Sequence, residues 1–200
     1  ADLDAGIITY NHDGSSTTAD TFDFTDDDGA GAPSAGTINW TINGVNDAPV
    51  TSAIELTPIA YTENAGPVVI TSTLSLSDDD DVNLESAVVR ITSNYANGED
   101  VLAVVDQFGI TGSWNAVSGT LTLSGTATVA QYQSVMQSIT YENTSDDPST
   151  LTRTVAFTVN DGDVNSNTQM RDINFAAVNN PVGPISDTDA AAETIAEDAA

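Results

Sequence analysis

The 200-residue chain contains no cysteine and no lysine. Without cysteine it has no disulfide and no thiol nucleophile, so a secreted domain of this size must be stabilised in another way. Arg90, Arg153 and Arg171 are the only fixed cations against 30 acidic residues, and the formal net charge is -27. Such a chain repels nucleic acid and anionic membrane surfaces, so we expect neither as a partner.

The side chains of common active sites are scarce. His12 is the only histidine, which excludes a catalytic metal held by several imidazoles and leaves no spare histidine for acid–base work. No Gly-x-Ser-x-Gly motif occurs, so a nucleophilic serine is not indicated. Paired carboxylates hydrolyse glycosides in some enzymes, but acidic pairs in Asp-rich turns are more simply ion ligands. We therefore expect no enzymatic activity.

Long hydrophobic runs are also missing. No apolar segment approaches the ~20 residues of a membrane-spanning helix, so we expect no membrane insertion. The chain begins at Ala1 with neither methionine nor a signal peptide, and we expect it to be a fragment of a longer protein. Hydrophobic residues nevertheless make up 40% of the chain, which is typical of a folded domain and too many for a disordered acidic tail.

The hydrophobic residues recur with a period of two in runs rich in Thr and Val. Ile38, Trp40 and Ile42 alternate with polar residues, and Val155 and Phe157 do the same. This pattern predicts half-buried β-strands, and the short spacing between Gly, Asn, Asp and Pro turns predicts antiparallel sandwiches. Further predicted strands lie at 6–10, 21–25, 53–59, 68–72, 86–93, 101–105, 109–114, 120–124, 138–143 and 170–177.

Only one segment has the period of a helix. Thr128 and Gln131 form a capping-box pattern, and Tyr132, Val135 and Met136 then share one face with Val129. The sequence therefore predicts one short helix, which closes an end of a sandwich through core packing.

A repeated motif divides the chain. Val45-Asn-Asp-Ala-Pro-Val50 follows one predicted strand and Val178-Asn-Asn-Pro-Val182 follows another, so the period is 178 − 45 = 133 residues. The prolines stop each strand and begin a stiff linker. We expect residues 1–49 to be the C-terminal part of one repeat, 50–178 a complete repeat, and 179–200 a linker with the start of the next.

These motifs, in this order, resemble the bacterial cadherin-like (CSPG/cadherin-type) repeats that occur in tandem in large RTX-type surface adhesins. The segment at 45–50 is similar to their inter-repeat linker, and residues 1–24 are similar to the second half of such a repeat. The matching stretches of the central unit are 61–66 (YTENAG), 76–84 (LSDDDDVNL), 119–125 (GTLTLSG), 139–143 (ITYEN) and 154–162 (TVAFTVNDG).

The resemblance implies an all-β fold of antiparallel Ig/cadherin-like β-sandwich repeats in tandem, with one short helix in the central repeat. It also implies an extracellular location on a bacterial cell surface, and a role in cell adhesion or biofilm formation as a calcium-stabilised, rigid extender that packs against neighbouring repeats. Two features depart from the family pattern. The second linker lacks the aspartate that Asp47 supplies. Four consecutive aspartates stand at 78–81 where the family more often has Asp-x-Asp, which leaves the choice of ligand among Asp78, Asp79, Asp80 and Asp81 open.

The clustered carboxylates favour calcium, because Ca²⁺ takes six to eight oxygen ligands in irregular geometry, whereas Mg²⁺ requires a stricter octahedron. If residues 78–81 are strand-like, Asp78 and Asp80 converge while Asp79 and Asp81 face away. Glu63 resembles the glutamate that cadherin-type repeats offer near a junction. The site predicted at the first junction comprises Asp26 or Asp28, Asn46, Asp47, Glu63, Asp78 and Asp80. A second site would use Asp161, Asp163, Asn179 and Glu197, with Asp187 or Asp189.

Three alternatives to a calcium-stabilised extender remain open. The acidic runs are also compatible with a solvated, solubilising surface, above all at high salt. A polysaccharide-binding module would need aromatic rings exposed on one face, with Trp40, Trp114, Tyr95 and Tyr141 as candidates. A self-assembling filament subunit would complete residues 1–49 with strands from another chain, through homotypic contacts.

Overall fold

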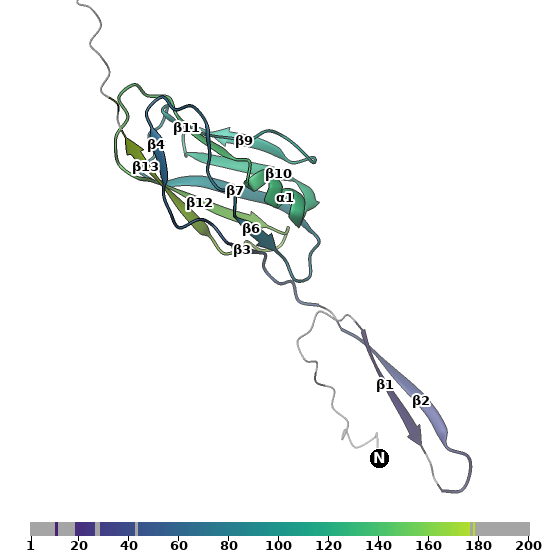
Figure 1. Ribbon diagram of the computed structural model, residues 1–200. Coiled ribbons are helices and arrows are strands. Elements are labelled where there is room, and N and C mark those ends of the chain that lie inside the picture. Colours follow the sequence, from purple (N-terminus) through teal and green to yellow (C-terminus); the bar gives the residue numbers. More distant parts are fainter. Residues whose placement is uncertain (1–10, 12–18, 27–28, 43, 177, 179–200) are drawn as a thin grey trace, which may run out of the picture.

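The computed structural model describes residues 11, 19–26, 29–42, 44–176 and 178. A β-sandwich spans Val50 to Ala176, and a separate hairpin precedes it, joined by a linker (Figure 1). The elements are β1 (Ala19–Asp26), β2 (Ser34–Thr41), β3 (Val50–Ser52), β4 (Ile59–Thr62), β5 (Val68–Val69), β6 (Ser75–Ser77), β7 (Asn83–Ser93), β8 (Asp100–Ala103), β9 (Thr111–Asn115), β10 (Thr120–Thr128), α1 (Val129–Met136), β11 (Thr140–Asn143), β12 (Arg153–Asn160) and β13 (Gln169–Ala176).

The main sheet of the sandwich has six strands in the order β4-β13-β12-β7-β10-β9. Opposite it lie the three-stranded sheet β5-β11-β8, the β3–β6 pair and α1. All the described pairs are antiparallel except β4–β13, which is parallel. The all-β fold predicted by the period-two alternation is therefore confirmed, with a single parallel pair that the sequence did not predict.

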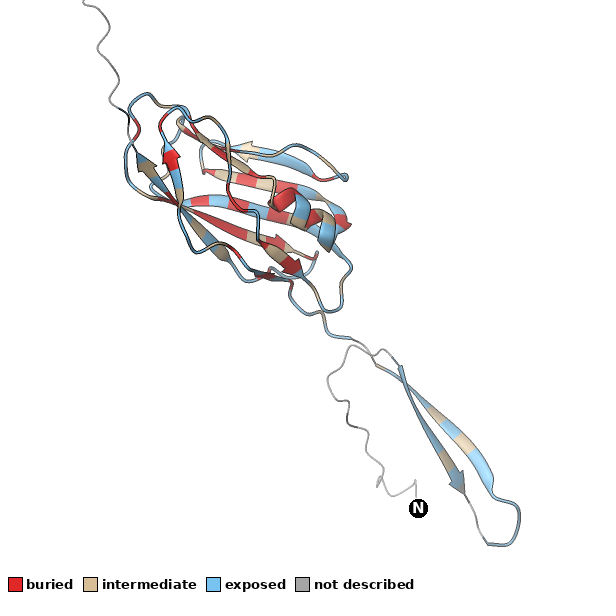
Figure 2. Ribbon diagram, viewed as in Figure 1, coloured by how far each residue is buried: buried red, intermediate tan, exposed pale blue. Residues whose placement is uncertain are grey.

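Alternation along the strands forms the core. In β7, the side chains of Leu84, Val89 and Ile91 are buried, whereas the intervening Val88 and Arg90 are exposed. Figure 2 shows buried residues on the sandwich strands and mostly exposed or intermediate residues on the hairpin. The buried faces of most sandwich strands thus contribute to a single hydrophobic cluster, which is the main stabilising term of such a domain.

The predicted helix is present as α1. Thr128 Oγ1 accepts a hydrogen bond from the Gln131 N–H at 3.2 Å, and Gln131 Oε1 accepts one from the Thr128 N–H at 3.0 Å. Tyr132, Val135 and Met136 are buried against the strands. The capping box and the apolar face identified in the sequence are both confirmed.

The strand predicted at 53–59 is wrong. The chain instead forms β3 before it and β4 at its end, and Ala53 between them has a positive φ of 55°. That left-handed conformation breaks an extended segment. Leu56, which is 96% exposed, lies in this connection, so the period-two pattern there did not reflect a buried face. The strand predicted at 6–10 lies outside the described residues.

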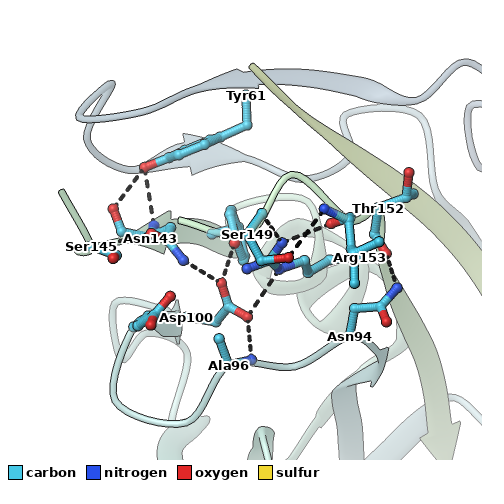
Figure 3. Close-up of polar contacts among 12 residues, drawn as sticks. Tyr61, Asn94, Ala96, Asp100, Asn143, Ser145, Ser149, Thr152 and Arg153 are labelled. Carbon is cyan, nitrogen blue, oxygen red and sulfur yellow. Dashed lines mark hydrogen bonds and ion pairs between the residues drawn. The ribbon is translucent and has the colours of Figure 1, made fainter. Parts of the chain in front are cut away.

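One end of the sandwich contains a buried ion pair (Figure 3). Arg153 and Asp100 have fully buried side chains, and Arg153 Nε lies 3.2 Å from Asp100 Oδ2. The other oxygen of Asp100 accepts hydrogen bonds from the Tyr141 hydroxyl and the Asn143 amide. The Arg153 guanidinium also stacks over the ring of Phe175, 4.2 Å from its centroid. Charge, hydrogen bonds and aromatic packing therefore lock the start of β12 to β8, β11 and β13.

Candidate metal centre

The acidic run at 78–81 forms a bend between β6 and β7, not a strand. Asp78 Oδ1 accepts hydrogen bonds from the N–H groups of Asp80 at 3.2 Å and Asp81 at 2.9 Å. This turn, closed by an aspartate side chain, folds the backbone back on itself. As a result, potential ligand oxygens of Asp78, Asp80 and Asp81 all lie within 4.8 Å of one another.

The bend corrects one prediction about these aspartates. Strand alternation predicted that Asp81 would face away from Asp78 and Asp80 together with Asp79. In the bend, Asp81 joins the other two carboxylates and Asp79 is left exposed. Which of the four consecutive aspartates converge is therefore determined by a turn that the Asp78 side chain closes, and not by the two-residue period of a strand.

Among the described residues, no arginine forms an ion pair with the three clustered carboxylates. Asp78 Oδ2 is buried and has no hydrogen-bond partner among the described atoms. Partial desolvation, followed by repulsion from Asp78 and Asp81, raises the pKa of Asp80 above its usual value, although an N–H donated by Asp47 opposes this rise. An unpartnered buried oxygen and close like charges are both unfavourable without a cation.

The linker before the sandwich docks on this acidic end. The Asp47 N–H donates to both carboxylate oxygens of Asp80, at 3.2 and 3.3 Å. The side-chain amide of Asn46 donates to Asp161 Oδ2 at 2.9 Å. The structure therefore brings together Asn46, Asp47, Asp78 and Asp80, as predicted for the first junction, and adds Asp161 and Asp81 to them.

Asp161 is held in the loop between β12 and β13. Its Oδ1 accepts the N–H groups of Asp163 at 2.8 Å and Val164 at 2.7 Å. Burial opposes ionisation of Asp161, but the bonds from Val164, Asn46 and Asp163 lower its pKa. The prediction that Asp161 and Asp163 serve the second junction is wrong: β12 runs toward the linker end, so the turn that follows it reaches the first junction.

Glu63 lies at the other end of the sandwich. It follows β4 directly, is 6% exposed, and accepts the Val178 N–H on Oε2 at 3.0 Å. Its own N–H donates to the Ala176 carbonyl at 3.1 Å. Because β4 pairs parallel with β13, both strands end together, and Glu63 belongs with the exit linker. Its predicted place in the first-junction site is wrong.

Asp26 does not lie at the first junction either. Asp26 ends β1 and pairs with Ser34 at the turn of the hairpin, whereas the linker follows the other end of β2. At about 3.4 Å per residue, the 8-residue strand separates these ends by roughly 24 Å. Asp26 is therefore removed from this site. The predicted ligands Asp28, Asn179, Asp187, Asp189 and Glu197 lie outside the described residues.

Comparison with known proteins links the chain to a very large protein. No protein-family model matches it. A stretch of 125 residues is 30% identical to part of halomucin of Haloquadratum walsbyi. That stretch covers 60% of this chain but 1% of halomucin, so the chain spans a very small part of this curated relative. Within the described residues, no helix is long and apolar enough to cross a membrane.

The aromatic residues proposed for sugar stacking do not form a common exposed face. Tyr141 is fully buried and donates its hydroxyl to Asp100. Tyr95 and Trp114 meet edge to face with centroids 6.2 Å apart and are partly buried against the core. Trp40, which is 36% exposed, lies on the separate hairpin. Tyr141 is therefore a core residue, and the described geometry gives no specific support to a polysaccharide platform.

Two members of the acidic end lie where the sequence pattern did not place them, since Asp81 was expected to face away and Asp161 to lie at the second junction. Asp81 has a local signal, because an aspartate three residues before it is able to close a turn by accepting its N–H. Asp161 has no such signal for its end of the sandwich, because only the strand order fixes which loops meet. The site therefore depends on topology as much as on motif.

Proposed function

We propose that this chain is a structural segment of a large extracellular protein, in which calcium bound at the acidic end fixes the linker to the sandwich. In the finer form of this proposal, the parent protein is a cell-surface adhesin, and the segment is an extender repeat that serves adhesion or biofilm formation. The similarity to a stretch of halomucin supports an extracellular structural role.

One observation carries the calcium proposal. Three carboxylates lie within 4.8 Å of one another; one of them, Asp78, has a buried and unpartnered oxygen, and another, Asp80, accepts the linker N–H of Asp47. Calcium favours such oxygen-rich, irregular loops. A cation here would neutralise the repulsion and rigidify the bend to which Asp47 is bonded. The same ion would thereby stabilise the sandwich and restrict the linker.

The expected size of the effect is large for a small domain. Ligand that binds only the folded state at 100 times its dissociation constant stabilises folding by about 2.7 kcal/mol. Domains of this kind are stable by roughly 5–15 kcal/mol in total. Calcium should therefore raise the melting temperature by several degrees, and chelation should reverse the change.

The test compares two neighbouring Asp→Asn variants by calorimetric calcium titration and by melting in EGTA or calcium. Asp80→Asn removes a charge from the cluster and keeps an oxygen for the Asp47 N–H, whereas Asp79→Asn removes an exposed charge outside it. Because folding raises the pKa of Asp80, the ionised carboxylate destabilises the metal-free fold at neutral pH. We expect Asp80→Asn to melt higher in EGTA and to lose most of the calcium response.

Asp79→Asn is the matched control and should respond to calcium as the unaltered chain does. Equal calcium responses in both variants would place the ion elsewhere. No heat of binding and no change in melting on adding calcium to the unaltered chain would refute the proposal. Neither result depends on the identity of any ligand at an adhesin tip.

A further inference from the structure

The β1–β2 hairpin carries an apolar face that the described sandwich does not cover. Phe22 and Phe24 of β1 lie on the same face as Ile38 and Trp40 of β2, because Phe22 pairs with Ile38. Phe22 is 43% exposed and Trp40 36% exposed. Among the described strands, β1 and β2 pair only with each other. An isolated two-stranded hairpin is marginally stable in water, so a stable sheet requires further strands beside β1 and β2.

The register of the hairpin identifies what it is. In the sandwich, the last two strands pair Arg153 with Ile173. In the hairpin, Asp20 pairs with Trp40. Adding the 133-residue period to 20 and 40 gives 153 and 173, the numbers of the pair in the sandwich. The rule holds across the β12–β13 ladder: the pairs 21–39, 22–38, 23–37 and 24–36 of the hairpin correspond to 154–172, 155–171, 156–170 and 157–169.

The sequence repeats at the same offset. Phe24-Thr25 corresponds to Phe157-Thr158, and Val45-Asn46 corresponds to Val178-Asn179. Asp20 stands where Arg153 stands in the sandwich, so the buried pair with Asp100 is not repeated. The strand register and the Val-Asn motif that follows each hairpin are shared, although not every core residue is identical. These two features make β1–β2 the counterpart of β12–β13.

The partners of β12 and β13 define what the hairpin lacks. β12 pairs with β7 along its other edge, and β13 pairs with β4. Against these neighbours, Val155, Phe157 and Ile173 are completely buried. We infer that β1–β2 is the closing hairpin of a second sandwich, whose β7-like strand pairs with β1 and whose β4-like strand pairs with β2. The chain preceding residue 1 in the longer protein supplies both strands.

A second copy of this chain does not offer the same partner. Its own β7 is already bonded on both edges, to β12 and to β10. A strand equivalent to β7 has an unpaired edge only in a sandwich that lacks its closing hairpin. The β1–β2 hairpin is the element that would complete such a sandwich. This inference stands on strand register and does not depend on calcium.

Cysteine pairing in the longer protein tests the inference, since the described chain has no native cysteine to interfere. Thr158 pairs with Val88 across β12 and β7. Thr158→Cys with Val88→Cys is therefore the control within the sandwich. The test pair is Thr25→Cys with a cysteine at the residue aligned with Val88 one period upstream. We expect both pairs to form intramolecular disulfides on mild oxidation, because directly paired strand residues lie within disulfide reach.

A disulfide in the control but not in the test pair would overturn the inference. A disulfide between two molecules of the Thr25→Cys protein would also overturn it, in favour of a second copy. Trp40 fluorescence in a Trp114→Phe background provides a reading without cysteines. Its emission should shift to shorter wavelength, with less quenching by acrylamide, when the upstream repeat is added to the 200-residue chain. An unchanged spectrum would contradict the predicted burial.

Discussion

Arg153 connects β12 to β8 and β13 at one end of the sandwich. Its guanidinium joins Asp100 of β8 and also donates to the carbonyls of Ser149 and Leu151 in the loop before β12. A buried ion pair is costly to desolvate, but removing one partner leaves the other charge buried and unpaired. Asp100 would then keep a carboxylate that only neutral donors, from Ala96, Tyr141 and Asn143, still satisfy.

We therefore predict that Arg153→Met lowers the free energy of unfolding by about 3–5 kcal/mol, measured by urea denaturation. Arg90→Met is the matched control, because Arg90 is exposed on β7 and such surface changes alter stability by about 0.5 kcal/mol or less. Adding Asp100→Asn to Arg153→Met should recover part of the loss, since the stranded charge is removed. Similar losses in the two single arginine variants would contradict a special role for the buried pair.

At the scale of single elements, α1 shows how a short helix is fixed by its first turn. Its eight residues are too few for stable helix formation in isolation. Packing of Tyr132, Val135 and Met136 supplies most of its stability, and the reciprocal bonds between Thr128 and Gln131 set where it begins.

We predict that Thr128→Ala destabilises the sandwich by about 1 kcal/mol, the usual cost of losing an N-cap oxygen. Thr128→Ser retains that oxygen and should be nearly neutral. Thermal melting monitored by circular dichroism measures both variants. If Ser and Ala at this position were equally destabilising, the methyl group of Thr128 and not its cap would be responsible.

Comparison of the elements shows what the sequence was able to predict. The alternation in β7 and β12 and the capping box of α1 are local, so they predicted strands and a helix correctly. The positions of Glu63 and Asp161 are not local. Which end of the sandwich each occupies depends on the parallel pairing of β4 with β13 and on the direction of β12. No pattern within either segment encodes that order, and the two residues were therefore assigned to each other's ends.

At the scale of the whole molecule, the net charge of -27 separates two effects of cations. Any salt screens repulsion between exposed carboxylates over a Debye length of about 10 Å at 0.1 M. A specific calcium site acts in addition, at concentrations too low to screen. The solubilising-surface alternative predicts only the first effect, and the proposed metal centre predicts both.

We predict that calcium chloride raises the melting temperature of the EGTA-treated, dialysed chain well above sodium chloride at the same ionic strength. Sodium chloride alone should give a gradual rise without saturation, and calcium a rise that saturates. Differential scanning calorimetry across both series measures the difference. Coincident curves would mean that the acidic runs act only as a charged surface.

The parallel β4–β13 pair has a mechanical consequence. The linker at Asn46 is bonded to one end of the sandwich, and Val178 leaves at the other. Tension along the chain reaches β4 through β3 from the first end and β13 from the second. Since β4 and β13 run in the same direction, opposite pulls slide them past each other and load their hydrogen bonds together in shear. If an edge strand were instead pulled away from one of its ends, its hydrogen bonds would break one after another. The parallel arrangement of β4 and β13 therefore suits a segment that is stretched along its length.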